Sequence, residues 1–169
     1  MISKVSNICL VLLTLFLACC KNQETTNSNT STQNGISESK TSTVQKLLLD
    51  SLVKFEGKKL QADGLLDQFG INDRIKVLLG KDISYFNEGW GVESTLKKDI
   101  DVMYATACKK DNCNTLKLLL VLDILTNNIN IYVFDNGRVR TFEESIIIGL
   151  SDQVSVEYER LRDDQMAGK

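Results

Sequence analysis

Two cysteines separated by four residues, Cys108 and Cys113, form the most distinctive chemical pattern in the chain. On a single helix their side chains would point in different directions, so a bond between them requires a turn. The intervening Lys110-Asp111-Asn112 provides turn-forming residues. In an exported protein the pair predicts a disulfide that clamps a helix–turn–helix corner and stabilises it by roughly 2 kcal/mol. Two unpaired cysteines are the alternative. Two ligands are too few for zinc, and the spacing differs from that of a CxxC redox motif.

Two further groups have the composition of protein-binding sites. Tyr85, Phe86 and Trp90 lie in a segment rich in glycine, and tyrosine and tryptophan often dominate protein interfaces. The alternative is that Trp90 is a core residue and that the glycines only make the turn. Arg138 and Arg140 project from one face of an expected strand, where they predict a contact surface for a carboxylate-rich partner. A solvated strand face is the alternative for the arginines.

The composition excludes several classes of function. The chain has no histidine, which removes the most common general base and metal ligand, and with them serine triads, cysteine–histidine dyads and ordinary zinc sites. No Walker, GxGxxG, GxSxG or EF-hand motif is present. Carboxylates are plentiful, yet no pair is marked out for the acid–base chemistry of a hydrolase. The net charge is −2 and no basic tract occurs, so nucleic-acid binding is not expected. We therefore predict a protein without catalytic residues, metal or cofactor.

Residues 1–18 have the pattern of a signal peptide. Lys4 precedes an apolar run over residues 8–18, which is well short of the roughly 20 residues that span a bilayer. An uncleaved membrane anchor is the alternative. The segment Leu17-Ala18-Cys19-Cys20 resembles the lipobox of bacterial lipoproteins, in which a small residue precedes the cysteine that receives the lipid. This resemblance implies lipidation of Cys19, with Cys20 as the alternative, and attachment to a membrane through several acyl chains.

The remaining chain divides into a tether over residues 19–43 and a compact domain over residues 44–166. The tether consists almost entirely of Asn, Ser, Thr, Gln and scattered charge, which predicts disorder. In the domain, apolar residues at helical spacing predict helices over residues 44–55, 60–69, 74–79, 94–108 and 116–125. Residues 141–144 have the pattern of a capping box, which predicts that a last helix follows them and ends near residue 162. For residues 116–125 a buried strand is the alternative. Residues 84–91 are expected to form a loop.

One β-hairpin interrupts this helical pattern. Residues 129–134 and 139–142 are rich in β-branched and aromatic residues, and they flank Asn136-Gly137, a pair typical of tight hairpin turns. In a two-residue turn Asp135 faces Arg138, and Val133 faces Arg140. The predicted fold class is therefore a small, mainly α domain with one β-hairpin, which becomes α+β if the hairpin extends.

The lipobox, the Ser-, Thr- and Asn-rich tether and the Lys-, Asn- and Ile-rich domain together resemble the outer-surface lipoproteins of Borrelia-type spirochaetes. The resemblance implies a surface-exposed protein that is lipid-anchored in the outer membrane. It also implies binding of a host serum or matrix protein in adhesion or immune evasion, with capture of complement factor H as the function of one subgroup. We therefore expect a non-enzymatic binding module. The alternative is a structural or housekeeping lipoprotein of the envelope that faces the periplasm.

Overall fold

The computed structural model describes residues 48–167. The predicted signal peptide, the lipidation at Cys19 or Cys20 and the predicted tether all lie outside these residues. The described part contains two 3₁₀ helices, four α-helices and six strands, which follow one another along the chain as η1 (Leu49–Phe55), α1 (Leu65–Gln68), α2 (Ile71–Leu79), η2 (Gly80–Asp82), α3 (Ser84–Gly89), β1 (Val92–Glu93), β2 (Lys97–Asp99), β3 (Val102–Cys108), β4 (Leu116–Asp123), β5 (Asn128–Asp135), β6 (Arg138–Glu143) and α4 (Asp152–Ala167).

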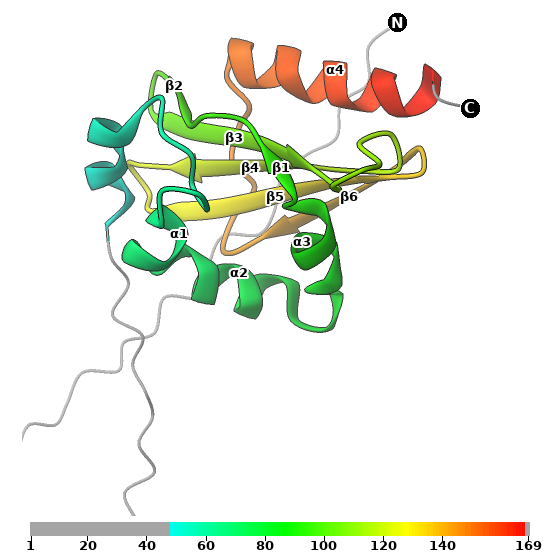
Figure 1. Cartoon of the computed structure of the whole chain (residues 1–169). Helices are drawn as coiled ribbons and strands as arrows, with labels where there is room; N and C mark the ends of the chain where they lie inside the picture. Colours follow the sequence, from blue (N-terminus) through cyan, green and yellow to red (C-terminus); the bar gives the residue numbers. More distant parts are fainter. Residues whose placement is uncertain (1–47, 168–169) are drawn as a thin grey trace, which may run out of the picture. The chain divides into compact units, whose positions relative to one another are not determined.

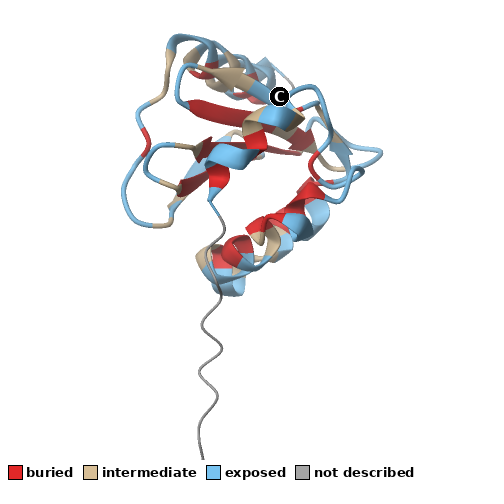
Figure 2. Cartoon of the chain, turned by 90° about the vertical axis from the view of Figure 1, so that its left-hand side faces the viewer, coloured by how far each residue is buried: buried red, intermediate tan, exposed pale blue. Residues whose placement is uncertain are grey.

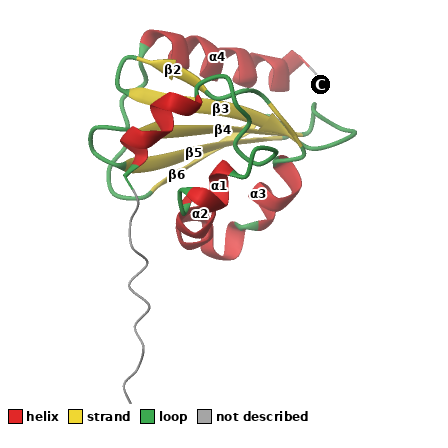
Figure 3. Ribbon diagram, turned by 60° about the vertical axis from the view of Figure 1, so that its left-hand side comes forward, coloured by secondary structure: helices red, strands yellow, loops and turns green. Residues whose placement is uncertain are grey.

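The strands form one antiparallel sheet, which is the central layer of the domain. Its strand order is β1-β3-β4-β5-β6. Strand β2 pairs with the same edge of β3 as β1 does, but β2 pairs with the start of β3 and β1 with its end. Helices α1, α2 and α3 cover one face of the sheet, and α4 lies across the other face (Figures 1 and 3). One hydrophobic core therefore lies on each face of the sheet.

The two cores divide the side chains of the central strands between them. Leu118, Leu120 and Leu122 of β4 belong to the core under the N-terminal helices, whereas Leu119 and Val121 belong to the core under α4. Successive residues of a strand point to opposite faces, so both sets are buried at once. Figure 2 shows this burial concentrated in the strands and on the inner sides of the helices. This double coverage removes the polar–apolar alternation that usually identifies a strand.

The prediction of a mainly α domain is wrong, because the domain is α+β with a six-stranded sheet. Residues 116–125, expected as a buried helix, contain β4, in agreement with the alternative of a buried strand. Residues 94–108, also expected as a helix, contain β2 and β3. In β3 the consecutive residues Val102, Met103 and Tyr104 are all buried because the strand has a core on each side. A continuous apolar run of this kind fits a buried helix equally well.

Other boundaries also differ from those predicted. Residues 84–91 were expected to form a loop, but they contain α3. The capping box expected at 141–144 does not begin a helix, because β6 continues to Glu143 and α4 starts only at Asp152. Thr141 pairs instead with Tyr132 of the neighbouring strand.

The predicted hairpin is confirmed, together with its register. Strands β5 and β6 pair with Asp135 opposite Arg138 and Val133 opposite Arg140. Asn136 and Gly137 between them have φ values of 48° and 78°, the left-handed conformation that asparagine and glycine tolerate best.

A buried arginine helps to hold η1 against the β4–β5 turn. The Arg74 guanidinium donates to the side-chain and backbone oxygens of Asn127 (3.2 and 2.8 Å) and to the carboxylate of Glu144 (2.9 Å). The backbone N–H of Leu49 donates to the same Asn127 side chain at 3.3 Å. The start of η1 is therefore held beside the β4–β5 turn. None of the helices within residues 48–167 has the length and apolar character needed to cross a bilayer.

Candidate functional site

Two connections emerge side by side at one end of the sheet. The β3–β4 connection contains Cys108–Cys113, here called the disulfide loop, and the β5–β6 turn is Asp135–Arg138, here called the hairpin tip. Because the four strands are consecutive and antiparallel, β3 and β5 end where β4 and β6 begin. The two connections therefore lie at the same end, which we call the loop end (Figure 1). Segments more than twenty residues apart thus form one surface.

The disulfide loop is short and is held closed in two ways. The structure joins Cys108 and Cys113 by a disulfide, with their Cα atoms 4.9 Å apart. The loop reverses direction at Asp111, which has a left-handed backbone with φ 65°. Backbone N–H groups of Asn112 and Lys109 donate to Lys109 O (3.2 Å) and Leu116 O (3.0 Å). The predicted turn is therefore present, but it connects two strands instead of two helices.

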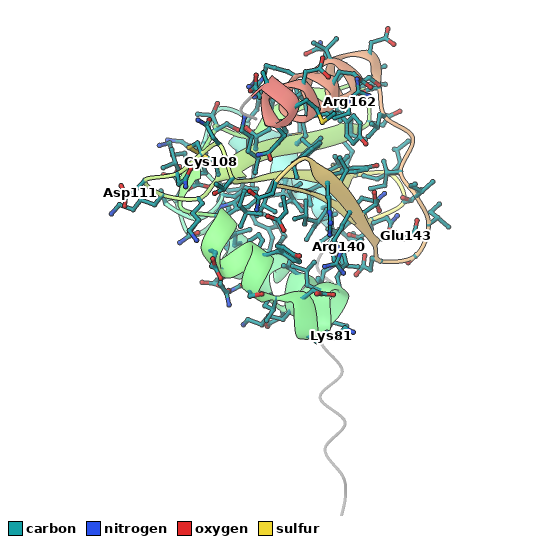
Figure 4. All side chains as sticks on the ribbon, turned by 90° about the vertical axis from the view of Figure 1, so that its right-hand side faces the viewer. Lys81, Cys108, Asp111, Arg140, Glu143 and Arg162 are labelled. Carbon is teal, nitrogen blue, oxygen red and sulfur yellow. A yellow bond between two sulfur atoms is a disulfide. The ribbon has the colours of Figure 1, made fainter. Side chains whose placement is uncertain are left out.

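The outer part of this loop is exposed. Lys110, Asp111 and Asn112 are exposed to solvent, and Figure 4 shows Asp111 at the tip, pointing away from the rest of the domain. The Lys109 ammonium lies 2.9 Å from a Glu88 carboxylate oxygen on α3. Within residues 48–167, Lys110 has no ion-pair or side-chain hydrogen-bond partner. The loop thus presents one unpaired cation on a fixed backbone.

Gly91 allows the loop to pack closely against β1. Its N–H donates to Cys108 O at 3.2 Å, and a Cβ at this position would lie 2.7 Å from Lys110 N and 2.9 Å from Lys110 Cβ. Any larger side chain would push against the loop backbone. The sequence alone gives no sign of this role for Gly91, because the contact with Lys110 depends on the pairing of the strands.

A backbone hydrogen bond joins the hairpin tip to the residues that follow the disulfide loop. The N–H of Asn136 donates to Thr115 O at 3.0 Å, immediately after the loop closes. Between these connections and α3 lies a hollow of about 380 Å³, lined by polar groups of all three segments, among them Asp82, Tyr85, Glu88, Lys109, Thr115 and Asp135. Three sites proposed separately from the sequence therefore border one another here.

The two hairpin arginines differ in their surroundings. Arg138 is exposed and has no ion-pair partner within residues 48–167. Arg140 donates to both carboxylate oxygens of Asp82 (3.2 and 3.1 Å) and to the Tyr85 hydroxyl (3.1 Å). These hydrogen bonds, the one with Tyr85 first, raise the pKa of Arg140 above its ordinary value. Arg140 therefore ties β6 to α3, and Arg138 is the arginine left free for a partner.

The two aromatic residues singled out from the sequence also separate. Tyr85 is half-buried, and its ring lies 5.2 Å from the Arg140 guanidinium. Trp90 is only 5% exposed, is stacked on Phe86 with ring centroids 4.9 Å apart, and donates from Nε1 to the Glu93 carboxylate at 3.0 Å. Trp90 thus packs in the core beneath the site. Within residues 48–167 no cluster of three or more Asp, Glu, Cys or His side chains is placed to hold a metal ion.

The comparisons with known proteins bear on this region. The family described as "Inhibitor of vertebrate lysozyme (Ivy)" matches residues 70–155, just over half of the 169 residues, from α2 to the start of α4. The match includes both the disulfide loop and the hairpin tip. No curated protein and no solved structure matches the chain.

This match corrects the resemblance drawn from composition. The chain does not belong with the Borrelia-type outer-surface lipoproteins, and nothing supports capture of complement factor H. A polar tether and a lysine-, asparagine- and isoleucine-rich domain describe the style of a sequence and fix no side chain in space. They could not distinguish one family of exported proteins from another.

Proposed function

The chain belongs to the Ivy family, the inhibitors of vertebrate lysozyme, and from that premise we propose that it is a non-enzymatic protein that binds a lysozyme and blocks its active site. The proposed contact surface is the loop end, with the disulfide loop entering the lysozyme cleft. The observation that carries this proposal is the position of the loop: a closed, exposed projection within the residues that match the family.

The chemistry of the target supports the choice of this loop. Lysozyme cleaves a glycosidic bond with two carboxyl groups, one of which donates a proton while the other stabilises the developing positive charge. Such a cleft attracts cations and is shaped for an extended sugar chain. The unpaired Lys110 ammonium at the exposed part of the loop supplies a cation without a carboxylate of its own. An ion pair with a catalytic carboxylate would occupy the proton donor or its partner.

Rigidity makes this loop suitable for inhibition. Binding is weakened by the entropy of ordering loops and long side chains at an interface, and a loop already fixed in its bound conformation avoids most of that loss. Here the disulfide, the Gly91 contact and the Lys109–Glu88 pair restrict the loop before any partner arrives. The hairpin tip beside it enlarges the surface toward the roughly 800 Å² per partner typical of stable complexes, and places Arg138 at its edge.

Inhibition of a lysozyme by the purified protein tests the proposal directly. We expect micromolar or lower concentrations to slow the hydrolysis of cell-wall glycan, and we expect Lys110→Glu to weaken this inhibition at least roughly tenfold, because it places a carboxylate against the acidic cleft. Lys58→Glu is the matched control, since Lys58 is exposed and its carbonyl accepts from Leu96 N just before β2, which pairs with the start of β3 and not with its loop end.

Two results would contradict the proposal at different levels. If the wild-type protein leaves lysozyme fully active at high micromolar concentration, the assigned function is wrong. If the wild type inhibits but Lys110→Glu and Arg138→Ala inhibit equally well, the function stands and the contact surface is elsewhere.

For the cellular location, family membership places the chain in the bacterial envelope. We propose that it faces the periplasm, lipidated at Cys19 or Cys20, because an inhibitor of a cell-wall hydrolase is needed where the wall lies. Mass spectrometry of the N-terminal peptide would identify the modified cysteine. Protease added to intact cells should leave the protein uncut, and rapid cleavage would instead place it on the outer surface.

A further inference from the structure

Helix α4 contacts both parts of the loop end from the face of the sheet opposite to α1–α3 (Figure 1). The contact is made by Gln165, a polar side chain that is only 4% exposed. Its Nε2 donates to Asn114 O at 2.8 Å, directly after the disulfide loop, and its Oε1 accepts from Gly137 N at 3.2 Å, in the hairpin tip. A single amide group thus uses both of its ends to connect the two loops.

This arrangement depends on the chemistry of glutamine. Its amide offers a donor and an acceptor in one plane, and burial makes each unmade hydrogen bond costly. A buried amide whose nitrogen and oxygen both make hydrogen bonds therefore fixes the separation and orientation of the two backbones that it joins.

A second contact from α4 supports the base of the same loop. The Lys117 ammonium, whose side chain is 9% exposed, lies 3.0 Å from the Asp164 carboxylate, and Lys117 pairs with Cys108 across β3 and β4. The hydrogen bond from Lys117 lowers the pKa of Asp164. Neighbouring residues of α4 thus hold both the loop base and the residue that follows the loop.

We propose that Gln165 is a positioning residue that locks the disulfide loop and the hairpin tip into one rigid surface for lysozyme. The choice of lysozyme as the partner rests on the proposed function, whereas the connection that Gln165 makes between the two loops, here called the brace, does not. Gln165 lies outside residues 70–155, so the brace is a property of this chain's own C-terminal helix and does not come from the family match. Gln165 acts through the loops and need not touch the lysozyme.

Hydrogen–deuterium exchange of the full chain without lysozyme tests the brace on its own. In Gln165→Leu, which keeps most of the side-chain volume and removes both hydrogen bonds, we expect residues 109–115 and 136–138 to exchange at least about tenfold faster, while β4 and β5 remain protected. Gln165→Glu keeps an acceptor for Gly137 but loses the donor to Asn114. It should therefore release residues 109–115 more than residues 136–138. Met166→Ala, an exposed position in the same helical turn, is the control.

Lysozyme binding kinetics with the same variants test whether the brace matters for inhibition. We expect roughly tenfold weaker binding for Gln165→Leu, intermediate binding for Gln165→Glu, and wild-type binding for Met166→Ala, each measured well below the melting temperature of the variant concerned. The proposal is overturned if Gln165→Leu folds and its two loops exchange as in the wild type, or if they exchange faster and lysozyme is bound with unchanged affinity. If the wild type does not bind lysozyme at all, the proposed function fails, while the exchange result still decides whether Gln165 braces the loops.

Discussion

At the scale of single residues, the site depends on a few contacts that only the folded chain reveals. Nothing in the sequence around Gly91 indicates a contact with the disulfide loop, yet a Cβ at this position would lie 2.7 Å from Lys110 N. Gln165 is an ordinary helix residue in the sequence, yet its amide joins two loops. In both cases the role of the residue depends on a loop segment that the fold brings against it.

A substitution at Gly91 should therefore disturb the loop more than the fold. We expect Gly91→Ala to lower the free energy of unfolding by about 1–3 kcal/mol, as overpacking usually does, and to weaken lysozyme inhibition because the backbone at Lys110 must move. Chemical denaturation and the inhibition assay measure the two effects. Gly149→Ala is the control, since its Cβ would meet nothing within 4 Å and its backbone is not left-handed. Equal inhibition by the two variants would show that the loop position tolerates this shift.

At the scale of elements, the sequence predicted local structure far better than pairing between distant segments. Asn136-Gly137 fixed the hairpin and its register because a tight turn is determined by its own residues. The residues of β3 fit a helix as well as a strand, and those of β4 fit a strand only as an alternative, because a strand buried on both faces lacks the alternation of polar and apolar residues. The candidate binding residues form three separate groups in the sequence. The strand order brings Lys109 and Asp135 to one hollow, and the packing of α3 against the sheet adds Tyr85.

The disulfide loop gives a prediction at this scale. Removing the bond with Cys108→Ser/Cys113→Ser should lower the free energy of unfolding by about 2 kcal/mol in the chain-entropy treatment of so short a loop. It should also weaken inhibition, because the loop must then be ordered on binding. Reducing the wild-type inhibitor, and removing the reductant before lysozyme is added, should reproduce the loss of inhibition, whereas the same treatment should have no effect on the double variant. Full inhibition by the reduced wild type would mean that the remaining contacts of the loop are sufficient.

At the scale of the whole molecule, two tyrosines of the core under α4 make the stability of the fold depend on pH. Desolvation raises the pKa of Tyr132 and of Tyr104, both of which belong to the core under α4. A hydrogen bond with Asn130 opposes this effect at Tyr132, and nearby negative charges add to it at both residues. The neutral phenols are therefore favoured by folding. Their contribution is complete below the unfolded pKa of about 10 and is lost as the pH rises through the higher folded value.

We therefore expect the free energy of unfolding to fall above about pH 10, and to fall less steeply in Tyr132→Phe than in the wild type. Denaturant titrations at a series of alkaline pH values measure the two slopes. The lysines titrate in the same range in both proteins, so the difference between the curves isolates the tyrosine. Parallel curves would show that ionised Tyr132 is accommodated without loss of the α4 core.

The hydrogen bond that holds Leu49 beside the β4–β5 turn also fixes how far η1 lies from the proposed binding surface. That turn is at one end of β4 and β5, and the loop end is at the other (Figure 1). Eight strand residues separate the two ends, a length of roughly 26 Å at the usual rise per residue. The start of η1 and the proposed lysozyme-binding surface are therefore separated by the length of the sheet. A partner that covers the loop end can do so without touching η1.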